Sequence, residues 1–250
     1  MIVSIHIPKT AGTTFGELLA RARQGRVFYD YHSYEYGRGY TYSAEHGRRL
    51  REGRAFIEHF FDVIHGHFFQ SQYAQLFPSA RYVTCLRDPI RRLVSHYRHY
   101  LSYSGRTDLG LIAFARQKYV RNMQYQFLAG RDIEDFAHVL ITERFAESVR
   151  LMAEKFPELG LGAETLGAIP WRNRGRNRPA PAVNPGRLTR LVLRVLLRKE
   201  YRLYRRALRR HRREMQSFLP GRSPGNGASG DGAGQAAAPR AGGGPRPAAR

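Results

Sequence analysis

Short apolar runs alternate with amphipathic stretches along the chain as far as residue 155. The runs span residues 2–7, 27–31, 62–68, 81–86 and 137–143. They are typical of buried strands, whereas the stretches that begin near Phe15, Pro89 and Arg144 have helical patterns. This alternation predicts an α/β fold, a three-layer sandwich around a central, mainly parallel sheet.

The last third of the chain has a different pattern. Between Leu188 and Met215, Leu, Val and Tyr recur with a near-helical period among arginines, which predicts one long amphipathic helix. Beyond it, Gly, Pro and Ala make up 22 of the 31 residues from Pro220 onward. We therefore expect one domain over residues 1–218, in which 172–215 form a basic loop and helix, and a disordered tail over 219–250.

The first apolar run leads into a segment suited to an anion. Lys9-Thr10-Ala11-Gly12-Thr13-Thr14 connects this run to the first predicted helix. A tight turn at a helix start aims backbone N–H groups at an anion, and Lys9 and the threonine hydroxyls add donors. An ordinary Thr N-cap is the alternative, but it does not account for Lys9 and Gly12. The segment is not a Walker loop, in which lysine follows the second glycine.

A second cationic segment follows the run over residues 81–86. Arg87-Asp88-Pro89 stands at the end of this predicted strand, and Ser95 lies in the helix that Pro89 opens. Helical spacing places Ser95 on one face with three arginines, Arg91, Arg92 and Arg98. Because parallel strands end at one edge of a sheet, Arg87 is expected at the same rim as Lys9. Two separated cationic sites suit a ligand with two phosphate-like groups.

Two histidines lie near the end of the run over residues 62–68. His65 and His67 are two residues apart, so on a strand they share one face. Histidine titrates in the range suited to a base that removes a proton from a hydroxyl. A pair of core histidines and a metal pair are the alternatives, although no third metal ligand is evident. The pattern favours a general base and no metal, and leaves open which histidine serves.

These motifs carry a resemblance to a known family. The segments His-Ile-Pro-Lys-Thr-Ala-Gly-Thr-Thr-Phe and Leu-Arg-Asp-Pro-Ile-Arg-Arg-Leu-Val-Ser-His-Tyr resemble the carbohydrate sulfotransferases that include the heparan sulfate 2-O- and 6-O-sulfotransferases. The resemblance covers roughly residues 2–155. It implies a P-loop-like fold and an O-sulfotransferase that uses 3′-phosphoadenosine 5′-phosphosulfate (PAPS) and no metal. Residues 9–14 would then hold the 5′-phosphosulfate, and Arg87 and Ser95 the 3′-phosphate.

The same resemblance implies roles for other residues. The 2-O-sulfotransferases carry a similar His-Gly-His element whose second histidine is taken as the base, which makes His67 the leading candidate and His65 its orienter or the second candidate. Lys9 would balance the charge on the leaving phosphate. Arg174 or Arg178, in a basic loop placed like the family's nucleotide lid, would contact the cofactor. The animal relatives are anchored in the Golgi, and because this sequence shows no apolar anchor we expect a short, bacterial form of the family.

The charge of the chain is strongly uneven. The net charge is +22, and residues 172–213 contain 15 Arg and one Lys against one Glu. Such a field attracts acidic partners, so we expect a carbohydrate acceptor that is acidic or lipid-linked, and peripheral contact with an anionic membrane. A merely solvated face is the alternative. The basic segment has no nucleic-acid recognition motif or stacking aromatic pattern, so no nucleic acid is expected.

Two other observations concern the compartment. Cys85 is the only cysteine and stands in an apolar run, which predicts a buried thiol without a disulfide. Met1 leads directly into the first predicted strand, and no apolar run has the length of a membrane span, so we expect a cytoplasmic protein.

Two other functional classes explain less of the sequence. A small-molecule kinase would share the strand, loop and helix of the first segment, but would need a Walker lysine and an Asp for Mg²⁺. A non-catalytic protein that binds polyanions would account for the basic helix, but not for the two cationic rim motifs or the paired histidines.

Overall fold

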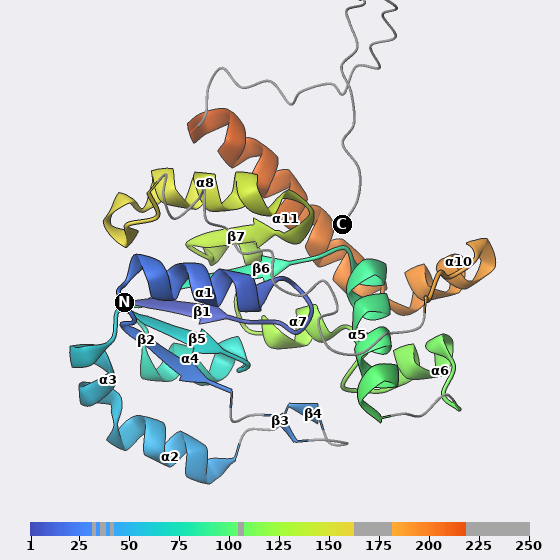
Figure 1. Cartoon of the computed structure of the whole chain (residues 1–250), viewed down its shortest axis with the longest axis horizontal. Coiled ribbons are helices and arrows are strands. Elements are labelled where there is room, and N and C mark those ends of the chain that lie inside the picture. The colour runs from blue at the N-terminus through green and yellow to red at the C-terminus, as the bar shows by residue number, and fades with distance from the viewer. Residues whose placement is uncertain (32–33, 36–38, 41–42, 105–107, 163–181, 219–250) are drawn as a thin grey trace, which may run out of the picture. The chain divides into compact units, whose positions relative to one another are not determined.

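A five-stranded parallel sheet forms the centre of the computed structural model, which describes residues 1–31, 34–35, 39–40, 43–104, 108–162 and 182–218. The strand order is β2-β5-β1-β6-β7, and every neighbouring pair is parallel. The strands are β1 (Ile2–Ile5), β2 (Val27–Asp30), β5 (Val63–Gly66), β6 (Arg81–Leu86) and β7 (His138–Ile141). Because β1 is the middle strand, the loop that follows it lies at the centre of the carboxyl edge (Figure 1).

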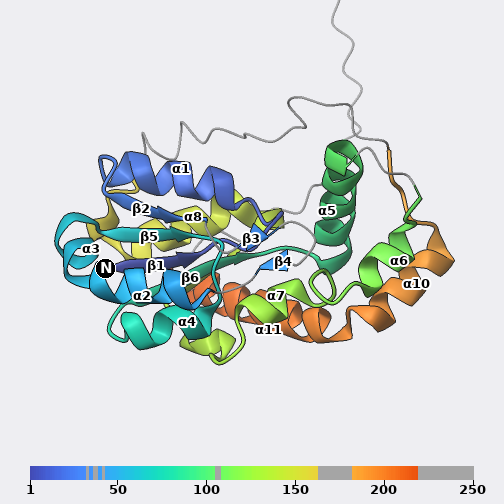
Figure 2. The ribbon, with the colours of Figure 1, turned by 90° about the horizontal axis from the view of Figure 1, so that it is seen from below.

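Helices cover both faces of this sheet (Figure 2). On one face lie α1 (Gly12–Ala22) and α8 (Phe145–Lys155). The other face is covered by α2 (Ala44–Glu52), α3 (Arg54–Phe60), α4 (Gln70–Leu76), α7 (Met123–Phe127) and α11 (Arg198–Phe218). The predicted three-layer α/β sandwich is therefore confirmed. A short antiparallel pair, β3 (Tyr34–Glu35) and β4 (Gly39–Tyr40), is separate from the main sheet.

Strand alternation explains the two core layers. In the first strand, Val3, Ile5 and Ile7 belong to the core beneath α4 and α11, whereas Ile2 belongs to the core beneath α1 and α8. Successive strand side chains point to opposite faces, so the apolar residues of this run divide between the two layers. The single cysteine, Cys85, is buried in the second of these cores as a free thiol, as the sequence predicts.

The basic helix differs from the prediction. Instead of one helix over 188–215, α10 (Arg187–Leu196) and α11 meet at a break at Leu197, where φ is −98° and ψ is 20°. Leu193 and Leu197 pack with residues of α5 (Pro89–Ser104) and α6 (Leu111–Arg116), whereas α11 packs on β7, α7 and α8. α11 also contacts α5 through Tyr201, but α6 is contacted by α10, and β7, α7 and α8 by α11, so the two helices bury most of their apolar residues against different elements.

Three predictions fall on residues that the structure does not describe. The tail over residues 219–250 and the basic-loop residues Arg174 and Arg178 lie outside the described ranges. Among the helices within those ranges, none is long and apolar enough to cross a membrane.

Candidate active site

The loop between β1 and α1 has an uncommon backbone. Lys9 (φ 70°) and Ala11 (φ 68°) both adopt the left-handed region, which non-glycine residues rarely occupy. Such strain costs about 1–3 kcal/mol per residue and persists mainly at functional sites. Left-handed residues are common in loops that turn successive N–H groups toward one concavity that binds anions. The phosphate cradle stays a prediction, and this backbone is of the kind that it requires.

Protein donors satisfy the carbonyl groups of this loop. The Thr10 hydroxyl donates to the Ile7 carbonyl at 2.8 Å, and the Thr142 hydroxyl donates to the Thr10 carbonyl at 3.1 Å. Arg87 Nη1 donates to the Lys9 carbonyl at 3.1 Å. This last bond confirms that the Lys9 loop and Arg87 meet at one rim, although 78 residues separate them. The Thr10 hydroxyl is therefore used inside the loop.

The rim carries a surplus of positive charge. Burial, and then the charge of Arg87, lower the pKa of Lys9 below its ordinary value. Burial is also the largest cause that lowers the pKa of Arg87. Within the described ranges no carboxylate forms an ion pair with Lys9, so an anionic ligand would relieve both the repulsion and the lost solvation.

A buried polar network holds Arg87 in place. The side chain of Gln124 in α7 accepts a hydrogen bond from the Arg87 N–H at 2.9 Å and donates to the Arg87 carbonyl at 3.0 Å. Glu200 in α11 accepts from the Gln124 backbone N–H at 2.9 Å. Sequence reasoning missed both residues. The available signal was a polar residue between Met123 and Phe127, two apolar residues that both belong to the core.

The arginines of helix α5 lie in different environments. Arg91 and Arg98 are exposed and Ser95 is partly exposed. Arg92, predicted to share their face, is fully buried instead, and its Nε lies 3.6 Å from Glu200 Oε2. The prediction for Arg92 was wrong because this position faces α7 and α11, where Glu200 compensates its charge.

Three histidines pack together beneath the N-terminal half of α1. The ring of His6 lies 5.2 Å from that of His65 and 4.2 Å from that of His67, centroid to centroid. His67 Nδ1 lies 2.5 Å from the His6 carbonyl oxygen. A carbonyl only accepts, so Nδ1 carries the proton and Nε2 carries the lone pair. His65 Nδ1 lies 2.8 Å from the Ser4 hydroxyl, deeper under the helix.

Burial keeps these rings neutral. It is the largest cause that lowers the pKa of His67 to about 4 and that of His65 to about 3. His65 is fully buried, whereas His67 is partly exposed. A neutral, partly exposed imidazole with its lone pair on Nε2 can accept a proton from a bound hydroxyl. The predicted pair of histidines on one face is present, and the two differ in their access to solvent.

Two further side chains border this cluster and were missed by sequence reasoning. The Tyr31 hydroxyl lies 3.1 Å from His6 Nδ1, and its ring centroid lies 4.8 Å from that of His67. His96 follows Ser95 in α5, and burial, together with the charges of Arg92 and Lys9, lowers its pKa well below the ordinary value. Tyr31 directly follows β2, so the rule that ligands bind at the carboxyl ends of strands could have identified it.

Close packing of α1 on these rings requires glycine. A Cβ atom at Gly16 would lie 2.7 Å from His65 Cδ2, and one at Gly12 would lie 1.8 Å from His6 Cδ2. We expect Gly16→Ala to lower the free energy of unfolding by about 1–3 kcal/mol through overpacking, measured by urea denaturation. Gly162→Ala, which meets no atom within 4 Å, is the matched control. Equal stability of the two variants would contradict the packing.

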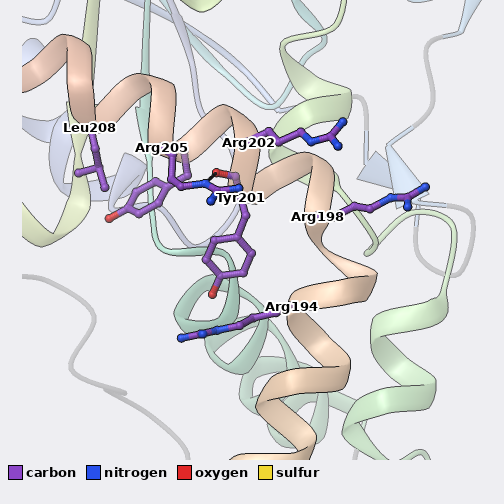
Figure 3. Close-up of a pocket in the computed structure, with 7 residues that line it drawn as sticks. Arg194, Arg198, Tyr201, Arg202, Arg205 and Leu208 are labelled. Carbon is purple, nitrogen blue, oxygen red and sulfur yellow. Dashed lines mark hydrogen bonds between the residues drawn. The ribbon is translucent and has the colours of Figure 1, made fainter.

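A basic pocket lies beside this rim, with a cavity volume of about 510 Å³ (Figure 3). Its lining comes from α10 and α11: Arg194, Arg198, Tyr201, Arg202, Tyr204, Arg205 and Leu208. The Tyr201 hydroxyl donates to Asp88 at 3.3 Å, and the Tyr204 hydroxyl donates to Glu143 at 2.8 Å. Asp88 directly follows Arg87, so these bonds attach the pocket to the rim.

The chain is similar to one protein family and to several solved structures. Residues 1–155 match a family described as "Sulfotransferase family". No match to a curated protein was found. Among solved structures, the chain is similar to a sulfotransferase from Alicyclobacillus acidocaldarius, with 17% identity, a TM-score of 0.48, and coverage of 83% of this chain and 95% of that one. It is also similar to mouse sulfotransferase SULT7A1 complexed with PAP, with 12% identity, a TM-score of 0.40, and coverage of 88% and 85%. Because the family match spans more than half of its residues, the protein belongs to the sulfotransferase family.

Proposed function

We propose that the protein transfers a sulfuryl group from PAPS to a hydroxyl of a carbohydrate, with His67 as the general base. The bond between His67 Nδ1 and the His6 carbonyl carries this proposal, because it leaves the basic lone pair on Nε2 of a neutral ring. The cationic loop at Lys9 follows the neighbouring strand at the same rim, so base and anion site are adjacent.

The rim residues fit a donor with two anionic ends. Residues 9–14 hold the 5′-phosphosulfate through backbone N–H groups, the Lys9 ammonium and the hydroxyls of Thr13 and Thr14. Arg87 and Ser95 hold the 3′-phosphate, and Arg174 and Arg178 are proposed as further contacts. The donor supplies the electrophilic sulfur. The positive charge of Lys9, which has no carboxylate partner within the described ranges, and the strained loop support this assignment.

The chain contributes a base and a charge to the transfer. His67 Nε2 accepts the proton of the acceptor hydroxyl as the new O–S bond forms. Lys9 balances the negative charge that develops on the bridging oxygen as the old S–O bond breaks. His6 fixes the tautomer of His67 through its carbonyl, and His65, which is fully buried, supports the packing of this cluster.

The acceptor is proposed to be acidic or lipid-linked, and the reaction to take place in the cytoplasm. The pocket lined by four arginines and two tyrosines, attached to Asp88, supports an acidic acceptor. The guanidinium groups of arginine bind carboxylate and sulfate groups through two parallel hydrogen bonds, and tyrosine rings offer flat surfaces for sugars.

Calorimetry with the desulfated product nucleotide tests the donor. We expect 3′-phosphoadenosine 5′-phosphate to bind without divalent metal and adenosine 5′-phosphate to bind far more weakly. Arg87→Ala should weaken the first interaction about 10- to 100-fold, because it removes a charged hydrogen-bond donor. Arg116→Ala, an exposed arginine at the end of α6, is the matched control. Equal affinity for the two nucleotides, or no binding, would refute the proposed donor.

A further inference from the structure

Helix α10 exposes a stripe of aliphatic side chains. Leu188, Leu191 and Val195 are 76%, 59% and 69% exposed. Their spacing of three and four residues places them on one side of the helix, which we call the α10 stripe. Exposed aliphatic residues are ordinary when they are scattered, but three adjacent ones on one helix face indicate an interaction surface.

The fold of the domain does not use this stripe. The opposite side of α10 already packs inward through Leu193 and Leu197, which are fully buried with Ile90, Leu93 and Phe114 of α5 and α6. Figures 1 and 2 both show α10 beside α6, beyond the carboxyl edge of the sheet. The stripe therefore faces away from the core, and its side chains can change without disturbing the packing of the helix.

A row of arginines borders the stripe and continues along α11. These residues are all exposed and follow one another at intervals of three or four: Arg187, Arg190, Arg194, Arg198, Arg202, Arg205, Arg209 and Arg212. We call them the arginine row. Within the described ranges none of the eight is paired with a carboxylate. In contrast, the arginines of α11 that face other elements are paired: Arg206 with Asp132 and Arg213 with Glu134.

The α10 stripe and the arginine row together favour a lipid bilayer over a polysaccharide as the partner. A linear polysaccharide would use the arginines but has no need of three exposed aliphatic side chains. An interfacial helix uses both, because its apolar side enters the acyl boundary while its cations meet anionic headgroups. Long arginine side chains can reach headgroups while their stems cover apolar surface. The net charge of +22 is complementary to an anionic bilayer.

We propose that α10 docks the protein on an anionic lipid bilayer, with Leu188, Leu191 and Val195 inserted into the interface and the arginine row against the phosphates. Four arginines of the row, Arg194, Arg198, Arg202 and Arg205, also line the pocket proposed for the acceptor, whereas the α10 stripe lies outside that pocket. Variants of the stripe therefore test the docking separately from the transfer chemistry proposed above.

Sedimentation of the full chain with vesicles tests the docking. We expect binding to vesicles of phosphatidylcholine with phosphatidylglycerol, and little binding to phosphatidylcholine alone. The triple variant L188S/L191S/V195S should lower the partition coefficient about tenfold or more, because it removes the inserted aliphatic groups. Its binding to heparin should be unchanged. The control F56S/F60S alters two side chains of α3 that are also 57% and 51% exposed, and should bind vesicles like the wild type.

Three results would overturn the docking of α10. The first is equal vesicle binding by the triple variant and the wild type, because the stripe would then not be inserted. The second is binding to heparin without binding to anionic vesicles, which would make a polysaccharide the partner of the arginine row. The third is a loss of vesicle binding in the F56S/F60S control as large as that in the triple variant.

Discussion

His67→Ala is expected to lower sulfate transfer about 10²- to 10⁴-fold, the usual contribution of a positioned general base. The ring is partly exposed and its proposed catalytic atom is Nε2, so nucleotide affinity should stay within a fewfold of the wild type. Transfer from PAPS to desulfated heparin, measured beside calorimetry of the product nucleotide, separates the two effects. His59→Ala, on α3, is the histidine control.

The dependence of sulfate transfer on pH also tests whether His67 is the general base. The ordinary pKa of histidine is 6.5, and burial lowers that of His67 to about 4, so the neutral, basic form persists as pH falls below 6.5. Activity that depends on this base should therefore decline only as pH approaches 4. An equal loss of transfer and nucleotide affinity in His67→Ala would assign the ring a structural role instead, and unchanged transfer would exclude it as the base.

Glu200→Leu is expected to lower the free energy of unfolding by about 3–5 kcal/mol, because it leaves the Arg92 charge buried without a partner. Both side chains are fully buried, and the same carboxylate holds the Gln124 backbone. Urea denaturation measures the loss. Glu52→Leu, which breaks an exposed pair with Arg48, should cost less than about 1 kcal/mol.

A double variant separates the charge from the packing at this site. Arg92→Met with Glu200→Leu replaces the pair by apolar side chains of similar length, and should recover most of the stability lost in Glu200→Leu. Product nucleotide should still bind more weakly to the double variant, since Gln124 loses its anchor and Arg87 its fixed backbone. A Glu200→Leu protein as stable as the wild type would contradict the role of the buried pair.

Much of this site follows from local patterns. The apolar run over 81–86 coincides with β6, and the spacing of His65 and His67 does place them on one side of the sheet. The rule that parallel strands end at one edge brought Lys9 and Arg87 together before any contact was known. These predictions succeeded because strand periodicity and strand ends are properties of a few consecutive residues.

Other features depended on contacts between distant segments. The break at Leu197 separates α10, which packs on α6, from α11, most of which packs on β7, α7 and α8. The periodic spacing of apolar residues over 188–215 does not reveal which elements each part of the helix will contact. Arg92 and Glu200 look like surface charges in an arginine-rich sequence, yet each is buried because the other is there. The tautomer of His67 likewise depends on a carbonyl 61 residues away. The periodicity of side chains thus determined the strands and the edge of the sheet at which Lys9 and Arg87 meet. Contacts between residues far apart in the sequence determined which polar groups are buried, held in place or left to face a ligand. The sequence alone could not show this second set, because those contacts exist only once the segments are packed.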